Sequence, residues 1–135
     1  MAWVCALAAA LCGVVRAAET PSKEHVEFFE TRIRPLLIDN CYKCHADGKA
    51  KGNLTLTTRG AILKGGDLGP AISLEKPDES NLLTAIQYRN GLEMPPTGKL
   101  RPDQIETLTK WVKAGLPMKD TAAATAKADT ISPSP

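Results

Sequence analysis

The sequence predicts an all-α fold in which three main helices are joined by long loops. Three stretches place apolar residues three or four positions apart, which is the spacing that gives a helix one buried face. Between the first two stretches, residues 46–78 are rich in Gly, Lys, Asp and Pro, which indicates loops with one short extended piece and one short helical turn. The 135 residues of the chain suit one domain rather than two.

The first helix is expected to begin at Thr20 or Ser22, whose side chains can cap a helix, and to end near Asn40. Pro35 lacks a backbone N–H, so it should kink this helix or restart it. The apolar face of the helix consists of Val26, Phe29, Ile33 and Leu36 or Leu37.

Two further helices are expected later in the chain. One runs from about Glu79 to Tyr88 and is ended by Asn90–Gly91, because glycine readily takes the conformation that closes a helix. The other begins near Pro102 and stops at Gly115. The residues expected to face the core are Leu82, Leu83 and Ile86 on the second helix, and Ile105, Leu108, Trp111 and Val112 on the third.

The two ends of the chain differ in composition from the middle. Residues 1–17 are almost wholly apolar and small, and a small-residue pattern allows cleavage after Ala17 or Ala18, so we predict a secretory signal peptide. An uncleaved N-terminal anchor is the alternative, although the apolar run is short for a membrane span. Residues 18–120 then form the folded domain, and residues 121–135, a tail of mostly small and polar residues, are expected to be disordered.

A Cys-Tyr-Lys-Cys-His motif at residues 41–45 carries the strongest chemical signal. Covalent haem attachment needs two thiols that reach the two vinyl groups of the porphyrin, and an imidazole that meets the iron from the same side. Cys41 and Cys44 provide the thiols on one turn of chain, and His45 follows directly. The motif therefore predicts one covalently bound haem c, with His45 as the proximal iron ligand.

Two other chemistries use cysteines at this spacing. A thioredoxin-type redox pair is expected within a βαβ pattern, which the sequence does not have. A zinc site needs four ligands, and outside the motif the cleaved chain offers only His25 as a further imidazole or thiol donor. Both alternatives are weaker than haem attachment.

The iron of such a haem has a sixth coordination position, for which Met94, Met118 and His25 are candidates. Two prolines follow Met94 and hold its backbone out of the helical region. Its thioether is a soft, uncharged ligand that favours reduced iron and raises the reduction potential. Met118 follows the third helix and is expected at the surface, while His25 lies off the apolar face of the first helix. We predict Met94 as the distal ligand, with His25 or an open site as alternatives.

Several segments of the chain together resemble a known family. They are residues 34–56 (RPLLIDNCYKCHADGKAKGNLTL), GPAI at 69–72, P-x-x-S-x-L at 77–82 and EMPP at 93–96. With Trp111 in the last helix, these segments resemble class I cytochromes c and, more closely, the planctomycete-type cytochrome c domain. The resemblance covers about residues 24–118 and implies the cytochrome c fold, in which three helices surround a haem bound by His and Met.

The resemblance also implies roles for individual residues. The residues that hold the haem are Cys41 and Cys44 as thioether attachments, His45 as proximal ligand and Met94 as distal ligand. Similarity to class I proteins further implies that the Pro70 carbonyl accepts a hydrogen bond from His45 Nδ1, which would fix the orientation of the ring. It also implies that Phe28 or Phe29 contacts Trp111 between the first and last helices.

These observations predict a single-haem c-type cytochrome that carries one electron at a time, is not an enzyme, and is periplasmic or otherwise exported. Its partners would be redox proteins, since a net charge of +2 gives no field for nucleic acid. No stable membrane span is expected after signal cleavage. The alternatives are a haem enzyme or gas sensor with an open sixth site, a thiol-redox or non-haem metal module, and a haem subunit docked in a larger dehydrogenase or oxidase.

Overall fold

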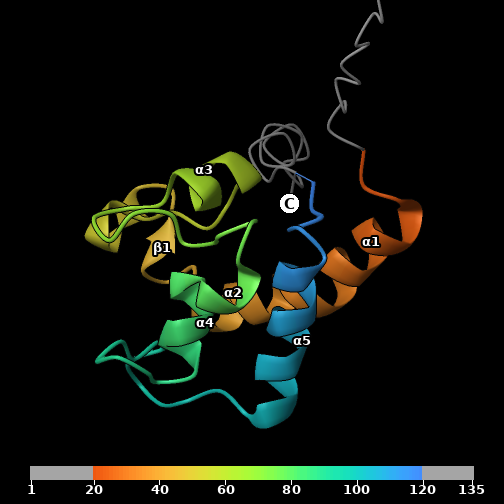
Figure 1. Ribbon diagram of the computed structural model, residues 1–135. Coiled ribbons are helices and arrows are strands. Elements are labelled where there is room, and N and C mark those ends of the chain that lie inside the picture. The colour runs from red at the N-terminus through yellow and green to blue at the C-terminus, as the bar shows by residue number, and fades with distance from the viewer. Residues whose placement is uncertain (1–19, 120–135) are drawn as a thin grey trace, which may run out of the picture.

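The computed structural model describes residues 20–119, so the predicted signal peptide at 1–17 and the predicted tail at 121–135 lie outside the described residues. In chain order the elements are α1 (Lys23–Phe28), η1 (Phe29–Ile33), α2 (Arg34–Asn40), β1 (His45–Ala46), β2 (Lys49–Ala50), η2 (Lys51–Asn53), α3 (Arg59–Lys64), η3 (Pro77–Glu79), α4 (Asn81–Ile86) and α5 (Pro102–Lys113). Figure 1 shows α1 and α2 as parts of one helical run that passes behind α5, with α3 in the looped region beyond α4. The helical character that the sequence predicts is therefore present.

Within residues 20–119, no helix is both long enough and apolar enough to cross a bilayer.

The first helix runs as three consecutive segments, α1, η1 and α2, from Lys23 to Asn40. It begins where the Ser22 hydroxyl accepts a hydrogen bond from the backbone N–H of His25, at 3.2 Å. Ahead of Pro35 the helix widens into the π-helical turn η1 and then restarts as α2. Pro35 thus falls in the first turn of α2, where a missing backbone N–H costs little. The predicted cap at Ser22, the restart at the proline and the end at Asn40 are confirmed.

The looped region at 46–78 contains more regular structure than the sequence predicts. The extended piece is an antiparallel pair of two-residue strands, with His45 opposite Ala50. The helical turn is α3, which begins where the Thr58 hydroxyl accepts a backbone N–H three residues further on, at 3.1 Å. It ends at Gly65, whose φ of 73° is a conformation that glycine takes at low cost.

Helices α4 and α5 correspond to the second and third predicted helices. Helix α4 ends at Ile86, two residues earlier than predicted, because Tyr88 has a φ of 56° and no longer follows the helical path. Ser80, the residue just before α4, makes no side-chain cap; its hydroxyl instead accepts a hydrogen bond from the backbone N–H of Ser73 at 3.0 Å. Helix α5 is ended by Gly115 with a φ of 88°, as predicted.

The core lies where α5 crosses the first helix. The rings of Phe29 and Trp111 have centroids 5.6 Å apart and planes tilted by 36°, so Phe29 makes the expected aromatic contact. The chain after α5 turns back over Trp111, whose Nε1–H donates to the Pro117 carbonyl at 3.2 Å. This return buries Leu116 and leaves Met118 only 4% exposed. The prediction of Met118 as a surface residue is wrong, because that prediction assumed that packing ends with the helix.

Candidate cofactor site

A cavity of about 400 Å³ lies between the Cys-Tyr-Lys-Cys-His motif and helix α4. This volume falls within the range of small-molecule and cofactor sites, roughly 300–1,000 Å³. The walls are mostly aliphatic, which favours a hydrophobic ligand. Among the aliphatic residues that line it are Leu54, Leu56, Leu68, Leu82, Ile86 and Leu92.

The two motif thiols reach this cavity from the end of α2. The Cys41 N–H donates to the Leu37 carbonyl at 2.9 Å, so this cysteine remains attached to the last helical turn. A tight turn follows, in which the N–H groups of Cys44 and His45 both donate to the Cys41 carbonyl, at 3.1 and 3.0 Å. Both thiols are free of disulfide bonds and line the cavity. Burial raises the pKa of the Cys41 thiol to about 11, which is opposite to the lowered pKa of a redox-active thiolate.

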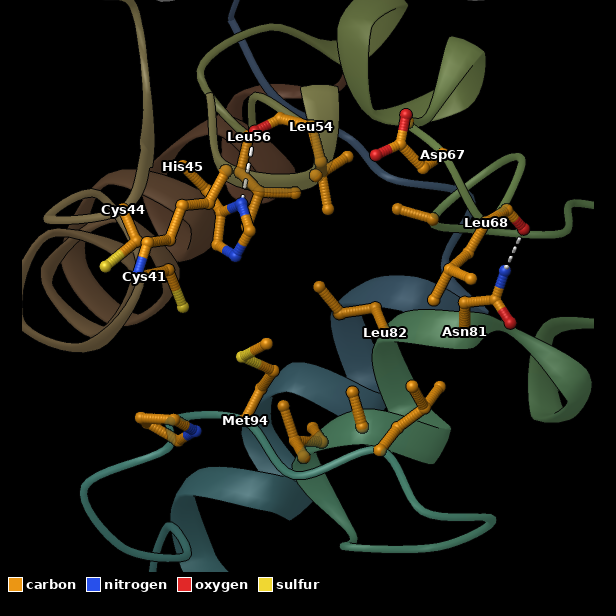
Figure 2. Close-up of a pocket in the computed structure, with 18 of the residues that line it drawn as sticks. Cys41, Cys44, His45, Leu54, Leu56, Asp67, Leu68, Asn81, Leu82 and Met94 are labelled. Carbon is orange, nitrogen blue, oxygen red and sulfur yellow. Dashed lines mark hydrogen bonds between the residues drawn. The ribbon is translucent and has the colours of Figure 1, made fainter. Parts of the chain in front are cut away.

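The imidazole of His45 is oriented by a backbone carbonyl. Its Nδ1 lies 3.1 Å from the carbonyl oxygen of Leu54, and because a carbonyl only accepts, Nδ1 carries the proton. In the tautomer with the proton on Nδ1, the lone pair for a metal ion is on Nε2, and Figure 2 shows this nitrogen directed into the cavity. The predicted acceptor, the Pro70 carbonyl, is wrong: that oxygen accepts from Asn81 Nδ2 at 3.0 Å. Leu54 takes its place because the Leu56 N–H donates to the His45 carbonyl at 2.9 Å and brings this segment against the ring.

The same segment, residues 54–57, supports the rest of the motif. The Tyr42 hydroxyl donates to the Leu56 carbonyl at 3.3 Å, and the Thr57 hydroxyl donates to the Asp47 carboxylate at 3.1 Å. Together with the two bonds to His45, these contacts connect the motif to one continuous piece of backbone. The orientation of the histidine is therefore set by short-range structure.

Met94 enters the cavity from the opposite side (Figure 2). Its backbone N–H donates to the Ala85 carbonyl at 3.0 Å, which connects the loop that carries it to the C-terminal end of α4. The Met94 side chain lines the cavity and is 43% exposed. A thioether and an imidazole nitrogen thus face one cavity from opposite walls.

The other candidate ligands lie elsewhere. His25 is an exposed residue of α1 and does not line the cavity, and Met118 is buried in the core. Within the part of the chain that the structure describes, no three His, Cys, Asp or Glu side chains are grouped to hold a metal ion directly. The geometry of these residues therefore offers no support for the zinc alternative.

Sequence reasoning missed the polar residues at the rim of the cavity. Asn81 donates to the carbonyls of both Leu68 and Pro70, at 3.1 and 3.0 Å, and so fixes the loop above α4. Asn53 donates to the Asp67 carboxylate at 2.6 Å. The Asn81 contacts carry no sequence signal, since their partners are backbone carbonyls that every residue has.

The donor set fits a covalently attached haem. Two free thiols, the Nε2 of His45 and the thioether of Met94 all face one cavity with mainly aliphatic walls. Cys41 and Cys44 would hold the vinyl groups, and His45 and Met94 would approach the iron from opposite sides. A zinc site or a thiol-redox pair would need neither the aliphatic cavity nor the thioether of Met94.

These features define a c-type cytochrome domain. Residues 41–98 match the family model of the planctomycete cytochrome C, which supports a cytochrome c-type domain of that kind in this part of the chain. The matched segment includes the motif and Met94. Such a domain carries covalently bound haem c, and electron transfer is the function of the class. No curated protein and no solved structure matches the chain.

Proposed function

We propose that this protein is an exported electron carrier with a single haem c, which passes one electron at a time between redox partner proteins. The haem is attached to Cys41 and Cys44, and its iron is bound by His45 and Met94. The observation that carries the proposal is the placement of the imidazole and the thioether on opposite walls of one cavity that also contains both thiols. The sequence contains one such motif, which supports a single haem.

The protein's own residues suit outer-sphere electron transfer. When bound, the haem supplies the one-electron Fe(III)/Fe(II) couple. With His45 and Met94 both in place, no coordination position is left for a substrate. The mostly aliphatic lining places few polar groups around the site that would have to reorient when the charge of the iron changes.

The same residues favour the reduced state. Methionine is a soft ligand, and burial among aliphatic side chains disfavours the extra positive charge of Fe(III). The Leu54 carbonyl accepts a hydrogen bond from His45 Nδ1–H and, unlike a carboxylate, places no negative charge beside the ring. We therefore expect a positive reduction potential.

The cellular setting of the proposal depends on the N-terminal sequence. Residues 1–17 have the apolar, small-residue pattern of a secretory signal, and covalent haem attachment takes place outside the cytoplasm. The partners would be other redox proteins of that compartment. The modest net charge of +2 gives no reason to expect a nucleic-acid partner.

The proposal is tested by expressing the protein with a c-type haem maturation system. Haem-dependent peroxidase staining of the denatured chain on a gel should show haem that stays with the polypeptide. The spectrum of the reduced native protein should be that of low-spin haem c, and carbon monoxide should not bind. A colourless chain with titratable thiols would overturn haem attachment, whereas rapid carbon monoxide binding would point to an open sixth position.

A further inference from the structure

The turn that follows α4, residues 87–91, has an unusual backbone. Three of its residues have positive φ values, which are 56° for Tyr88, 55° for Asn90 and 76° for Gly91. Glycine and asparagine tolerate this region, but a bulky aromatic residue is rarely found there. Such a residue persists where the surrounding contacts compensate for the strain. The contacts of the Tyr88 side chain are therefore informative.

The Tyr88 side chain reaches the loop that carries Met94. Its hydroxyl donates a hydrogen bond to the Pro95 carbonyl, and Pro95 is buried while Tyr88 is half-buried. On the other side of Met94, the Met94 N–H donates to the Ala85 carbonyl at 3.0 Å. The two bonds flank the methionine and attach its backbone to the end of α4.

From these contacts we infer that Tyr88 is a positioning residue, which holds the Met94 thioether opposite His45 through the Pro95 carbonyl. The inference rests on the proposed function of Met94 as the distal ligand. Without the hydroxyl, the Pro95 carbonyl keeps one weaker backbone bond, from the Gly98 N–H at 3.3 Å.

Ligand competition in the oxidised, haem-loaded full chain measures this effect. Cyanide binds ferric haem only where the sixth position is vacant, so its apparent affinity reports how often Met94 is displaced. Tyr88→Phe removes only the hydroxyl. It should raise the apparent affinity for cyanide about threefold to tenfold, the range expected for one lost hydrogen bond. The absorption band of methionine bound to ferric iron should weaken at the same time.

Thr109→Val is the control, because it removes a half-buried hydroxyl that donates to a backbone carbonyl, that of Ile105 at 2.7 Å, on α5 and outside the residues that line the cavity. It should leave cyanide affinity unchanged within about twofold, since the Met94 loop keeps its contacts. Unfolding in urea, measured for both variants, separates loss of stability from loss of positioning. An equal rise in cyanide affinity in both variants would mean that general loosening is the cause, and the inference would be overturned.

The double variant Tyr88→Phe/Met94→Ala distinguishes positioning of Met94 from shielding of the site. With no methionine to displace, the tyrosine substitution should no longer change cyanide affinity. The same threefold to tenfold rise in that background would mean that Tyr88 shields the site instead of positioning Met94, which overturns the inference. If the wild-type protein already binds cyanide as tightly as Met94→Ala, the proposed ligation by Met94 fails, and the inference fails with it.

Discussion

On one side of the cavity, the thiols of Cys41 and Cys44 and the ring of His45 come from five consecutive residues. We call this side, with the supporting segment 54–57, the proximal wall. On the other side, Met94 comes from a loop far along the chain and is attached to the end of α4. We call residues 85–96 the distal wall. The proximal wall is connected by bonds along one backbone segment, whereas the distal wall depends on how α4 and its loop pack.

This difference separates two tasks of the site. Attachment of a haem depends on the local spacing of two thiols and one imidazole, which a short segment supplies by itself. In the proposed function, control of the iron would depend on Met94, which must be brought from a distant part of the sequence. Changes in the proximal wall should therefore remove the cofactor, while changes in the distal wall should leave it bound and alter its chemistry.

The largest effect is expected from removing both attachment points. Cys41→Ala/Cys44→Ala should abolish covalent haem, because no other free thiol of residues 20–119 lines the cavity. Haem staining of the denatured chain measures this directly. The single variants serve as controls and should each retain one thioether and some stain. Full staining in the double variant would contradict the assignment of the proximal wall.

Met94→Ala should retain covalent haem but lower the reduction potential. The potential should fall by roughly 0.1–0.3 V, a fraction of the about 0.8 V over which axial ligands shift haem potentials. The direction follows from the loss of a soft ligand that favours Fe(II). Voltammetry measures the potential, and Met118→Ala, a buried methionine outside the cavity, is the control. An unchanged potential and spectrum in Met94→Ala would show that another group binds the iron.

Gly66→Ala should disturb the proximal wall from outside the motif. An added Cβ would lie 2.2 Å from the Gly52 carbonyl oxygen and 3.0 Å from the Leu54 side chain, so the segment that orients His45 must move. We expect a loss of about 1–3 kcal/mol in the free energy of unfolding, as is typical of overpacking. Urea denaturation measures it.

Gly60→Ala is the matched control for that substitution. Gly60 lies within α3 and has nothing within 4 Å of an added Cβ, so alanine should be neutral there or stabilise the protein by up to about 1 kcal/mol. Similar losses of unfolding free energy in both variants would mean that the close approach of Gly66 to the Gly52 carbonyl does not cause the destabilisation.

The smallest effect concerns the helix that leads into the proximal wall. Arg34 donates to the Glu30 carboxylate at 2.5 and 2.7 Å, and this hydrogen bond lowers the pKa of Glu30, opposed in part by burial. A lowered folded-state pKa gives stability above the unfolded value of about 4.3, which is lost as the pH falls through the folded value.

Glu30→Gln should therefore cost about 0.3–1 kcal/mol at pH 7, as is usual for partly exposed ion pairs. The difference from wild type should be smaller at pH 3 than at pH 7, because below the unfolded pKa of about 4.3 the pairing progressively stops favouring the folded state. Urea unfolding at both pH values measures it. A difference that is the same at both values would come from packing and not from charge.

Much of the helical framework could be predicted from local patterns. The cap at Ser22 follows from its side-chain hydroxyl, and the restart at Pro35 and the stop at Gly115 follow from the backbone properties of proline and glycine. Phe29 and Trp111 meet because both fall on apolar helix faces. Helix α4 is shorter than predicted, since the positive φ of Tyr88 belongs to a turn whose contacts lie outside the helix.

By itself, the sequence determined the chemistry of attachment. The Cys-Tyr-Lys-Cys-His spacing defines which atoms can reach one face of a ligand, whatever the rest of the chain does. Only the tertiary structure decided which backbone carbonyl orients His45, namely Leu54 and not Pro70, and that Met118 is buried. It also placed Met94 on the wall of the cavity opposite His45, and the Tyr88 hydroxyl against the carbonyl of the next residue, Pro95. Carbonyl groups are the same in every residue, so their roles depend on how the chain folds back on itself, over a short loop for Leu54 and over a longer stretch for Met94 and Tyr88.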